Sequence, residues 1–286
     1  MADIAVIEGD GETAALFNRF RDRVFEAAHN SIEKYSVALT VDDGQKLIAQ
    51  RSGILLQIAD MHFLVTAGHH MVSHHEQGHA VGIVLPVKEM HPVLLVEEQF
   101  WTTKDEQEDI SVTQLTPPVV EYIKDHYRYI RLNSVMSRKD PNQGKGMYLI
   151  FGFPDALLGP DDTGVKKMES WKYLSVSYRG DYANVENYNS RLHLVLTYER
   201  NTHNQQGERI HPPGMSGCGI WFVGTPQTHS LFNADDFKLV AIQNSWHKGF
   251  EYAKGTWIDD VLLILWKYYP ETRKPLMLAG YNFFGR

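Results

Sequence analysis

Short β-rich runs separated by turn-forming residues occupy most of this chain. Six runs lie between residues 35 and 115, namely YSVALTV, SGILLQIA, HFLVTA, AVGIVLPV, PVLLVEE and DISVTQL. Five more lie between 146 and 246, namely GMYLIFGFP, KYLSVSY, LHLVLTY, GCGIWFVG and FKLVAIQNSW. Because the runs follow one another with few helical segments between them, the pattern favours two antiparallel barrels or a sandwich over a βαβ fold.

Helical patterns are confined to the two ends. Residues 11–35 have apolar side chains near helical spacing, and TWIDDVLLILWKYYPE (256–271) reads as a second helix that ends at Pro270. A polar, turn-rich stretch separates the two groups of strands. We therefore expect an N-terminal helical extension (1–35), a first β-barrel (36–125), a linker (126–146), a second β-barrel (147–256), and a C-terminal helix and tail (257–286).

Composition excludes several classes of protein. The 286 residues carry a formal net charge of −7 and no long Lys/Arg run, which argues against a dedicated nucleic-acid binder. No apolar stretch approaches a membrane span, and the opening MADIAVIEGDGE lacks the pattern of a secretory signal. The single cysteine, Cys218, cannot form an internal disulfide. These features predict a cytoplasmic protein with no membrane or nucleic-acid partner.

The stretch TAGHHMVSHHEQGH (66–79) contains five histidines and fits two chemistries. One is the H-E-x-x-H zinc motif, in which His75 and His79 would bind the metal and Glu76 would act on a bound water. A third ligand is not obvious, and Pro86 stops the apolar run before a full helix is established. The zinc protease is therefore the less favoured alternative.

The second interpretation rests on three separated motifs. SGILLQIADMHFLVTAGHH resembles the start of a trypsin-like domain, with its T-A-x-H segment ending at His69. EDISVTQL resembles the strand that carries the buried aspartate, giving Asp109, and PGMSGCGIW resembles the G-x-S-G loop, giving Ser216. In this order the three motifs resemble those of the trypsin-like (chymotrypsin-fold) serine proteases, here as an intracellular, bacterial-type, stand-alone domain. The resemblance runs from about Ser52 to Tyr268.

This resemblance implies an all-β fold of two antiparallel barrels and a serine endopeptidase that needs no cofactor. His69 would be the general base, Asp109 would orient it, and Ser216 would be the nucleophile of an acyl-enzyme. The N–H groups of Gly214 and Ser216 would form the oxyanion hole. Its partner would be a protein or peptide substrate, and a regulatory partner stays open.

Substrate contacts follow from the same resemblance. The pocket-floor position falls on Ile210, which would favour an apolar side chain at P1. The strand before the C-terminal helix supplies Ser245, Trp246 and His247, but its match is uncertain by one residue, so Asn244 is an alternative to Ser245. An inter-strand loop over 180–190 is expected to shape access.

Two residues depart from the family pattern. Met215 stands where secreted members have an aspartate that pairs with a newly cut N-terminus, so that activation switch is not expected here. Cys218 replaces a glycine after the G-x-S-G loop. These departures keep a second hypothesis open, a catalytically silent protease-fold module that binds peptides.

Overall fold

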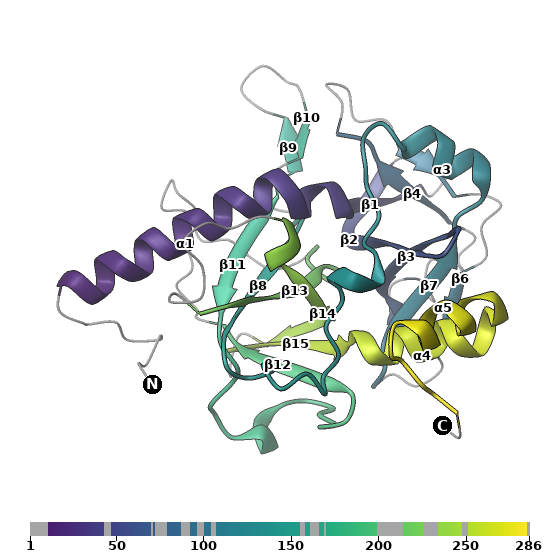
Figure 1. Cartoon of the computed structure of the whole chain (residues 1–286). Coiled ribbons are helices and arrows are strands. Elements are labelled where there is room, and N and C mark those ends of the chain that lie inside the picture. Colours follow the sequence, from purple (N-terminus) through teal and green to yellow (C-terminus); the bar gives the residue numbers. More distant parts are fainter. Residues whose placement is uncertain are drawn as a thin grey trace.

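The computed structural model describes most of the chain. These residues are 11–42, 47–69, 71, 79–86, 92–95, 100–103, 107–154, 158–160, 166–168, 170–198, 214–225, 234–247 and 251–284. Within them, two curled antiparallel sheets stand side by side with helices at the two chain ends, as Figure 1 shows.

The first sheet has seven strands, all paired antiparallel. Their spatial order is β5 (Pro92–Leu94), β4 (Ala80–Val84), β1 (Ser36–Asp42), β2 (Leu47–Ile58), β3 (Met61–Ala67), β7 (Ile110–Gln114) and β6 (Phe100–Thr102). The β2–β3 pair is a tight hairpin that turns at 59–60. Gly53 of β2 packs so closely that an added Cβ would lie 2.8 Å from Leu64 Cδ1, so the strands curl around a dense interior.

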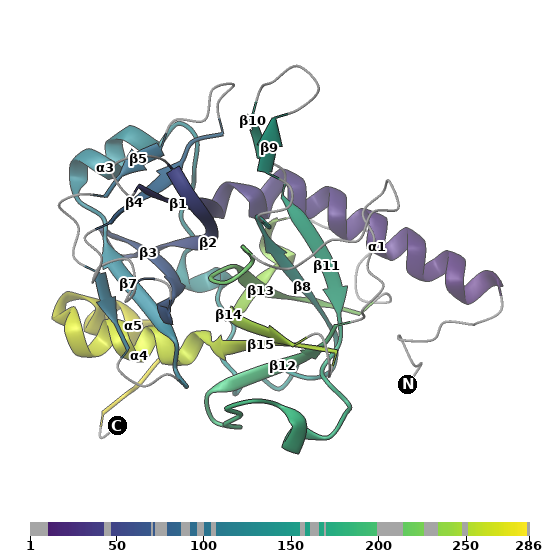
Figure 2. The same cartoon turned by 180° about the vertical axis from the view of Figure 1, so that it is seen from behind.

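The second sheet has six strands, again antiparallel. Its order is β11 (Trp171–Ser175), β8 (Met147–Gly152), β13 (Gly219–Gly224), β14 (Lys238–His247), β15 (Tyr252–Trp257) and β12 (His193–Thr197). Register shifts interrupt the ladder in β13 and in β14, where Gln243 pairs with Gly255 but Ser245 pairs with Lys254. Asn244 is therefore the extra residue of a β-bulge. A separate hairpin, β9 (Leu158–Pro160) with β10 (Lys166–Met168), projects from this half (Figure 2).

Helix α1 (Gly11–Ser31) and the 3-10 turn Ile32–Tyr35 confirm the helix predicted near the N-terminus. Phe20, Val24, Ala28 and Ile32 recur every four residues and are fully buried, so one stripe of the helix faces the protein. They belong to an apolar cluster that also holds residues of both sheets. The helix thus covers the junction between the two halves (Figures 1 and 2).

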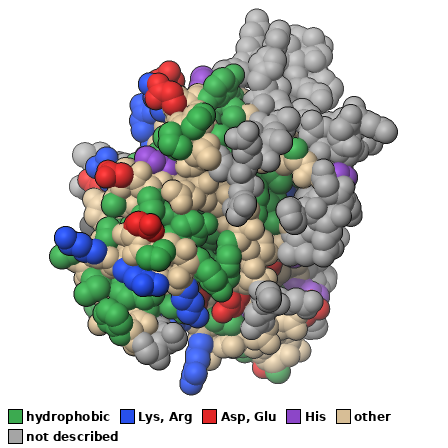
Figure 3. Space-filling model, turned by 90° about the vertical axis from the view of Figure 1, so that its right-hand side faces the viewer, with side chains coloured by type: hydrophobic (Ala, Val, Ile, Leu, Met, Phe, Trp, Pro, Cys, Tyr) green, Lys and Arg blue, Asp and Glu red, His purple; other side chains and the backbone are tan. Residues whose placement is uncertain are grey.

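Three helices cover the other side. They are α3 (Pro117–Ile123), α4 (Ile258–Tyr268) and α5 (Arg273–Leu278). Helix α4 follows β15 directly and ends before Pro270, as the sequence predicts. Leu278 of α5 is 80% exposed. Figure 3 shows the molecule from the right-hand side of Figure 1, where apolar side chains are interspersed with charged ones. No helix among the described residues is both long and apolar enough to cross a lipid bilayer.

Candidate active site

His69 lies just beyond the end of β3. The strand is buried from Phe63 to Ala67, which fixes the direction of the chain, and Gly68 then donates its N–H to the carbonyl oxygen of Asp109 over 3.0 Å. An added Cβ at Gly68 would lie 3.1 Å from the backbone of Ile110, so a small residue allows this close approach. His69 therefore lies where the end of β3 meets the start of β7 (Ile110–Gln114).

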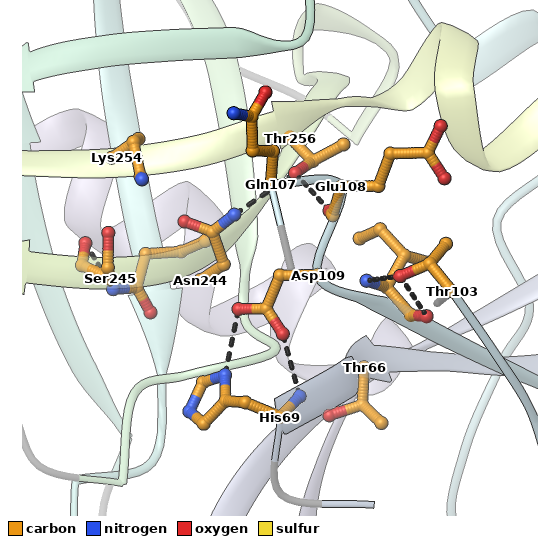
Figure 4. A network of polar contacts seen from close by, with 12 residues as sticks. Thr66, His69, Thr103, Gln107, Glu108, Asp109, Asn244, Ser245, Lys254 and Thr256 are labelled. Carbon is orange, nitrogen blue, oxygen red and sulfur yellow. Dashed lines mark hydrogen bonds and ion pairs between the residues drawn. The ribbon is translucent and has the colours of Figure 1, made fainter. Parts of the chain in front are cut away.

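Asp109 contacts His69 twice. Its Oδ2 lies 2.8 Å from the imidazole Nδ1, and its Oδ1 accepts the backbone N–H of His69 over 2.6 Å (Figure 4). A carboxylate is an acceptor only, so the proton is on Nδ1 and the lone pair is on Nε2. The two contacts fix both the tautomer and the orientation of the ring, as a general base requires.

The backbone at Asp109 has a φ of 45°, in the left-handed region that non-glycine residues rarely occupy. Contacts from the second sheet hold this turn. Thr256 of β15 donates its hydroxyl to the carbonyl oxygen of Glu108 over 2.6 Å, and it accepts the Asn244 Nδ2 amide over 3.0 Å. The carbonyl oxygen of the neighbouring Gln107 is also held by a residue of the second sheet.

His193 of β12 is the other anchor of this turn. Its Nδ1 accepts the backbone N–H of Asn189 over 3.0 Å, so Nε2 carries the proton and donates it to the carbonyl oxygen of Gln107, 2.6 Å away. Sequence motifs did not identify Thr256, Asn244 or His193 as supports of Asp109. No local pattern marks them, because β14 and β15 hold other polar residues as well.

The turn that carries Ser216 is built on glycine. Gly214 and Gly217 have φ values of 92° and 91°, which side-chain-bearing residues seldom adopt. The carbonyl oxygens of Gly214 and Ser216 accept hydrogen bonds from the hydroxyl and the N–H of Ser52 in β2, each over 3.1 Å. Among the described residues, the Ser216 N–H has no hydrogen-bond acceptor.

The Ser216 turn is packed tightly against the first sheet. Thr66, three residues before His69, donates its hydroxyl to the Ser52 carbonyl oxygen over 2.8 Å. An added Cβ at Gly217 would overlap both the Ser52 oxygen and the Thr66 hydroxyl. Ser216 is therefore carried by a turn that docks on β2 and on β3, the strand that leads to His69.

Met215 and Cys218 flank this turn and point into the protein. Both are buried among apolar side chains of the second sheet. Burial raises the pKa of the Cys218 thiol, so its reactive thiolate form is suppressed. These two departures from the family pattern therefore act as core residues.

A cleft of about 880 Å³ opens beside His69 and Asp109. It is lined on the other side by the predicted substrate residues Ser245, Trp246 and His247, together with Asn244, Tyr252, Lys254 and the loop residues Glu186 and Asn187. The His247 ring stacks on Tyr252 with centroids 5.5 Å apart. Part of the loop expected over 180–190 thus borders the cleft.

The structure describes only some of the remaining predicted residues. Ile210, His75 and Glu76 lie outside the described residues. His79 is described, and the residues directly after it form strand β4 instead of continuing a zinc-binding helix. No group of three or more metal-binding side chains is found within the described part of the chain.

Comparisons with known proteins identify the fold. No protein-family model and no curated protein sequence matches the chain. Among solved structures, an inactivated protease paralogue of the scabies mite matches 82% of this chain and 94% of its own at 11% identity, with a TM-score of 0.50. The double-sheet topology and this match show a chymotrypsin-like fold.

Two further protease structures match at slightly lower scores. An HtrA-type protease with a tripeptide is 11% identical over 87% of this chain and 62% of its own, with a TM-score of 0.49. The serine endoprotease from Yersinia pestis is 10% identical over 87% and 65%, also with a TM-score of 0.49. This chain spans less than two thirds of each of these two proteins.

Proposed function

We propose that this chymotrypsin-fold chain is a serine endopeptidase in which Ser216, His69 and Asp109 hydrolyse peptide bonds through an acyl-enzyme. The observation that carries the proposal is the pair of contacts from the Asp109 carboxylate to His69, one to Nδ1 and one to the backbone N–H. A carboxylate that fixes an imidazole in this way makes Nε2 a base, and the docked Ser216 turn supplies a hydroxyl on the neighbouring element.

The chemistry would proceed in two halves. His69 Nε2 takes the proton of the Ser216 hydroxyl as its oxygen bonds to the substrate carbonyl carbon, and the resulting imidazolium donates that proton to the leaving amine. Water then repeats the sequence on the ester, which regenerates the serine. Asp109 stabilises the imidazolium throughout, and the N–H groups of Gly214 and Ser216 would hold the carbonyl oxygen as it gains negative charge.

Met215 bears on how such an enzyme would be activated. Because it is buried and has no charge, it cannot pair with a newly formed N-terminal ammonium. We infer that activation by cleavage of the chain near its N-terminus is not the switch in this protein.

A fluorophosphonate probe followed by intact-mass spectrometry tests the proposal. The unmodified protein should gain one adduct, and Ser216→Ala and His69→Ala should gain none. Asp109→Asn should label about 10⁴-fold more slowly, because an amide favours the wrong histidine tautomer. Lys145→Met, at an exposed site that does not line the cleft, should label like the unmodified protein. Normal labelling of Ser216→Ala would refute the assignment.

A peptide-binding module that does not cut is the second candidate. One observation favours it: the cavity that Met215 lines together with Trp171, Tyr198 and Trp246 measures only about 10 Å³. That volume holds about one water molecule and no substrate side chain. Absence of any adduct on folded protein that still binds peptides would favour this candidate.

A further inference from the structure

Asn244 presents an unsatisfied acceptor in the cleft. The side chain is only 3% exposed, and its Nδ2 donates to the Thr256 hydroxyl over 3.0 Å. Thr256 has a single hydroxyl proton, which goes to the Glu108 carbonyl oxygen, so it must accept from Asn244. This fixes the orientation of the amide. Its Oδ1 is buried and has no hydrogen-bond partner among the residues that the structure describes.

Lys254 presents unused donors in the same cleft. The residue is 6% exposed, and its Nζ donates to the backbone carbonyl oxygen of Glu186 over 2.7 Å. Within the described part of the chain the ammonium has no carboxylate within ion-pair distance, so two of its three N–H groups are left over. Burial lowers the pKa of Lys254, and the negative charges of Asp109 and Glu186 oppose that shift.

The two groups are neighbours on adjacent strands. Lys254 pairs with Ser245, and Asn244 is the bulged residue immediately before it, so both side chains lie within reach of one ligand group. Both line the cleft beside His69 and Asp109, and Figure 4 shows them on the same side of that pair. Buried polar groups without partners are uncommon in proteins, and a bound ligand is one way of satisfying them.

The chemistry of the ligand follows from this pairing. Lys254 needs an acceptor and Asn244 Oδ1 needs a donor, and a primary carboxamide offers both on one carbon. A carboxylate offers acceptors only, and in this cleft it would also meet the negative charges of Asp109 and Glu186. The other titratable groups on the lining are His69, His247 and Tyr252. An apolar side chain would satisfy neither group.

We propose that this cleft is a substrate subsite for a side-chain carboxamide, so that the peptide ligand carries Gln or Asn. Its carbonyl oxygen accepts from Lys254 Nζ, and its NH₂ donates to Asn244 Oδ1. The inference rests on the proposed function for the identity of the ligand as a peptide, but binding in the subsite does not require that the peptide be cut.

Fluorescent pentapeptide mixtures test the subsite. Each mixture has Gln, Glu or Met fixed at one position, because these three side chains have nearly the same length, and the other positions are randomised. Binding to Ser216→Ala by fluorescence anisotropy should favour Gln over Met at one position by about 10- to 100-fold. The comparison uses three peptide sets on one protein, so its outcome does not depend on how a subsite variant folds.

Two variants then test whether Lys254 and Asn244 cause the preference for Gln. Lys254→Met and Asn244→Leu should each reduce the Gln preference to within a few-fold of Met, and Lys145→Met should leave it unchanged. Equal binding of the three mixtures at every position would overturn the subsite, and a preference for Glu over Gln would overturn the role of Asn244. Loss of fluorophosphonate labelling in the unmodified protein, with the Gln preference intact, would refute only the proposed hydrolysis.

Discussion

Replacing Thr256 by valine removes the hydroxyl that ties the Asp109 turn to the second sheet while keeping the side-chain volume. Thr256 is fully buried, and its hydroxyl serves the Glu108 carbonyl oxygen and the Asn244 amide at once. The variant therefore removes both hydrogen bonds of this hydroxyl, one of them with the buried Asn244 amide. At about 1–3 kcal/mol for a polar group that loses its partner, part of it recovered by relaxation, we expect a loss of about 2–4 kcal/mol in unfolding free energy.

Thr256→Ser is the matched control, because it keeps the hydroxyl and removes only one methyl group. That change should cost about 1 kcal/mol. Urea unfolding followed by tryptophan fluorescence gives both free energies on the same scale. The left-handed backbone of Asp109 should also relax in the valine variant, so its rate of fluorophosphonate labelling should fall at least about tenfold below that of the serine variant.

The reasoning would be refuted if the valine and serine variants unfolded at the same urea concentration and labelled at the same rate. Equal stability with slow labelling in the valine variant would show that the hydroxyl orients Asp109 without stabilising the fold. The two readouts therefore separate the energetic role of Thr256 from its positioning role.

Further outcomes follow from the packing. Gly217→Ala should abolish labelling of the nucleophile, because its Cβ overlaps the first sheet, while Gly144→Ala, whose φ of 77° is also left-handed but whose Cβ meets nothing within 4 Å, should cost only about 1 kcal/mol in urea unfolding. Phe20→Ala should lower the unfolding free energy by about 3–5 kcal/mol, and Leu16→Ala, at a 42% exposed position, by less than about 1 kcal/mol. Burial raises the pKa of Asp260 to about 6 from an ordinary value of 3.8, so the folded state binds the extra proton and stability should fall as the pH rises from 4 to 6. Relative to Asp260→Asn, the unmodified protein should lose up to about 3 kcal/mol over that interval, and a flat difference would contradict the assigned burial.

Local sequence patterns predicted much of the fold. Period and composition of the short runs predicted strands in both halves, and the spacing of apolar residues predicted the helices at each end, because burial of one face leaves a regular trace in sequence. The T-A-x-H segment and the aspartate strand likewise placed His69 and Asp109, which the structure brings to 2.8 Å. Each of these features depends on residues that are close together in the chain.

The supports of the site depend on residues far apart in the chain, and so left no local trace. The ambiguity between Asn244 and Ser245 has a physical cause, since a β-bulge inserts one residue there and a regular alternation cannot assign both neighbours to a face. In the sequence Lys254 looks like an ordinary strand lysine, and only the structure shows its contact with the loop that carries Glu186. His193 and Thr256 act on a turn more than eighty residues away.

Neither sheet contains the proposed site on its own, and each half is fixed by the other. Ser52 of the first sheet holds the Ser216 turn of the second, whereas Thr256 of the second sheet holds the Asp109 turn of the first. A small rotation between the sheets would therefore shift both turns at once, although each sheet kept its own ladder. The apolar cluster that includes α1 joins the two sheets and resists that rotation. Substitutions in α1 should thus slow labelling of Ser216 in protein that is still folded, even though the helix contributes no residue to the cleft lining.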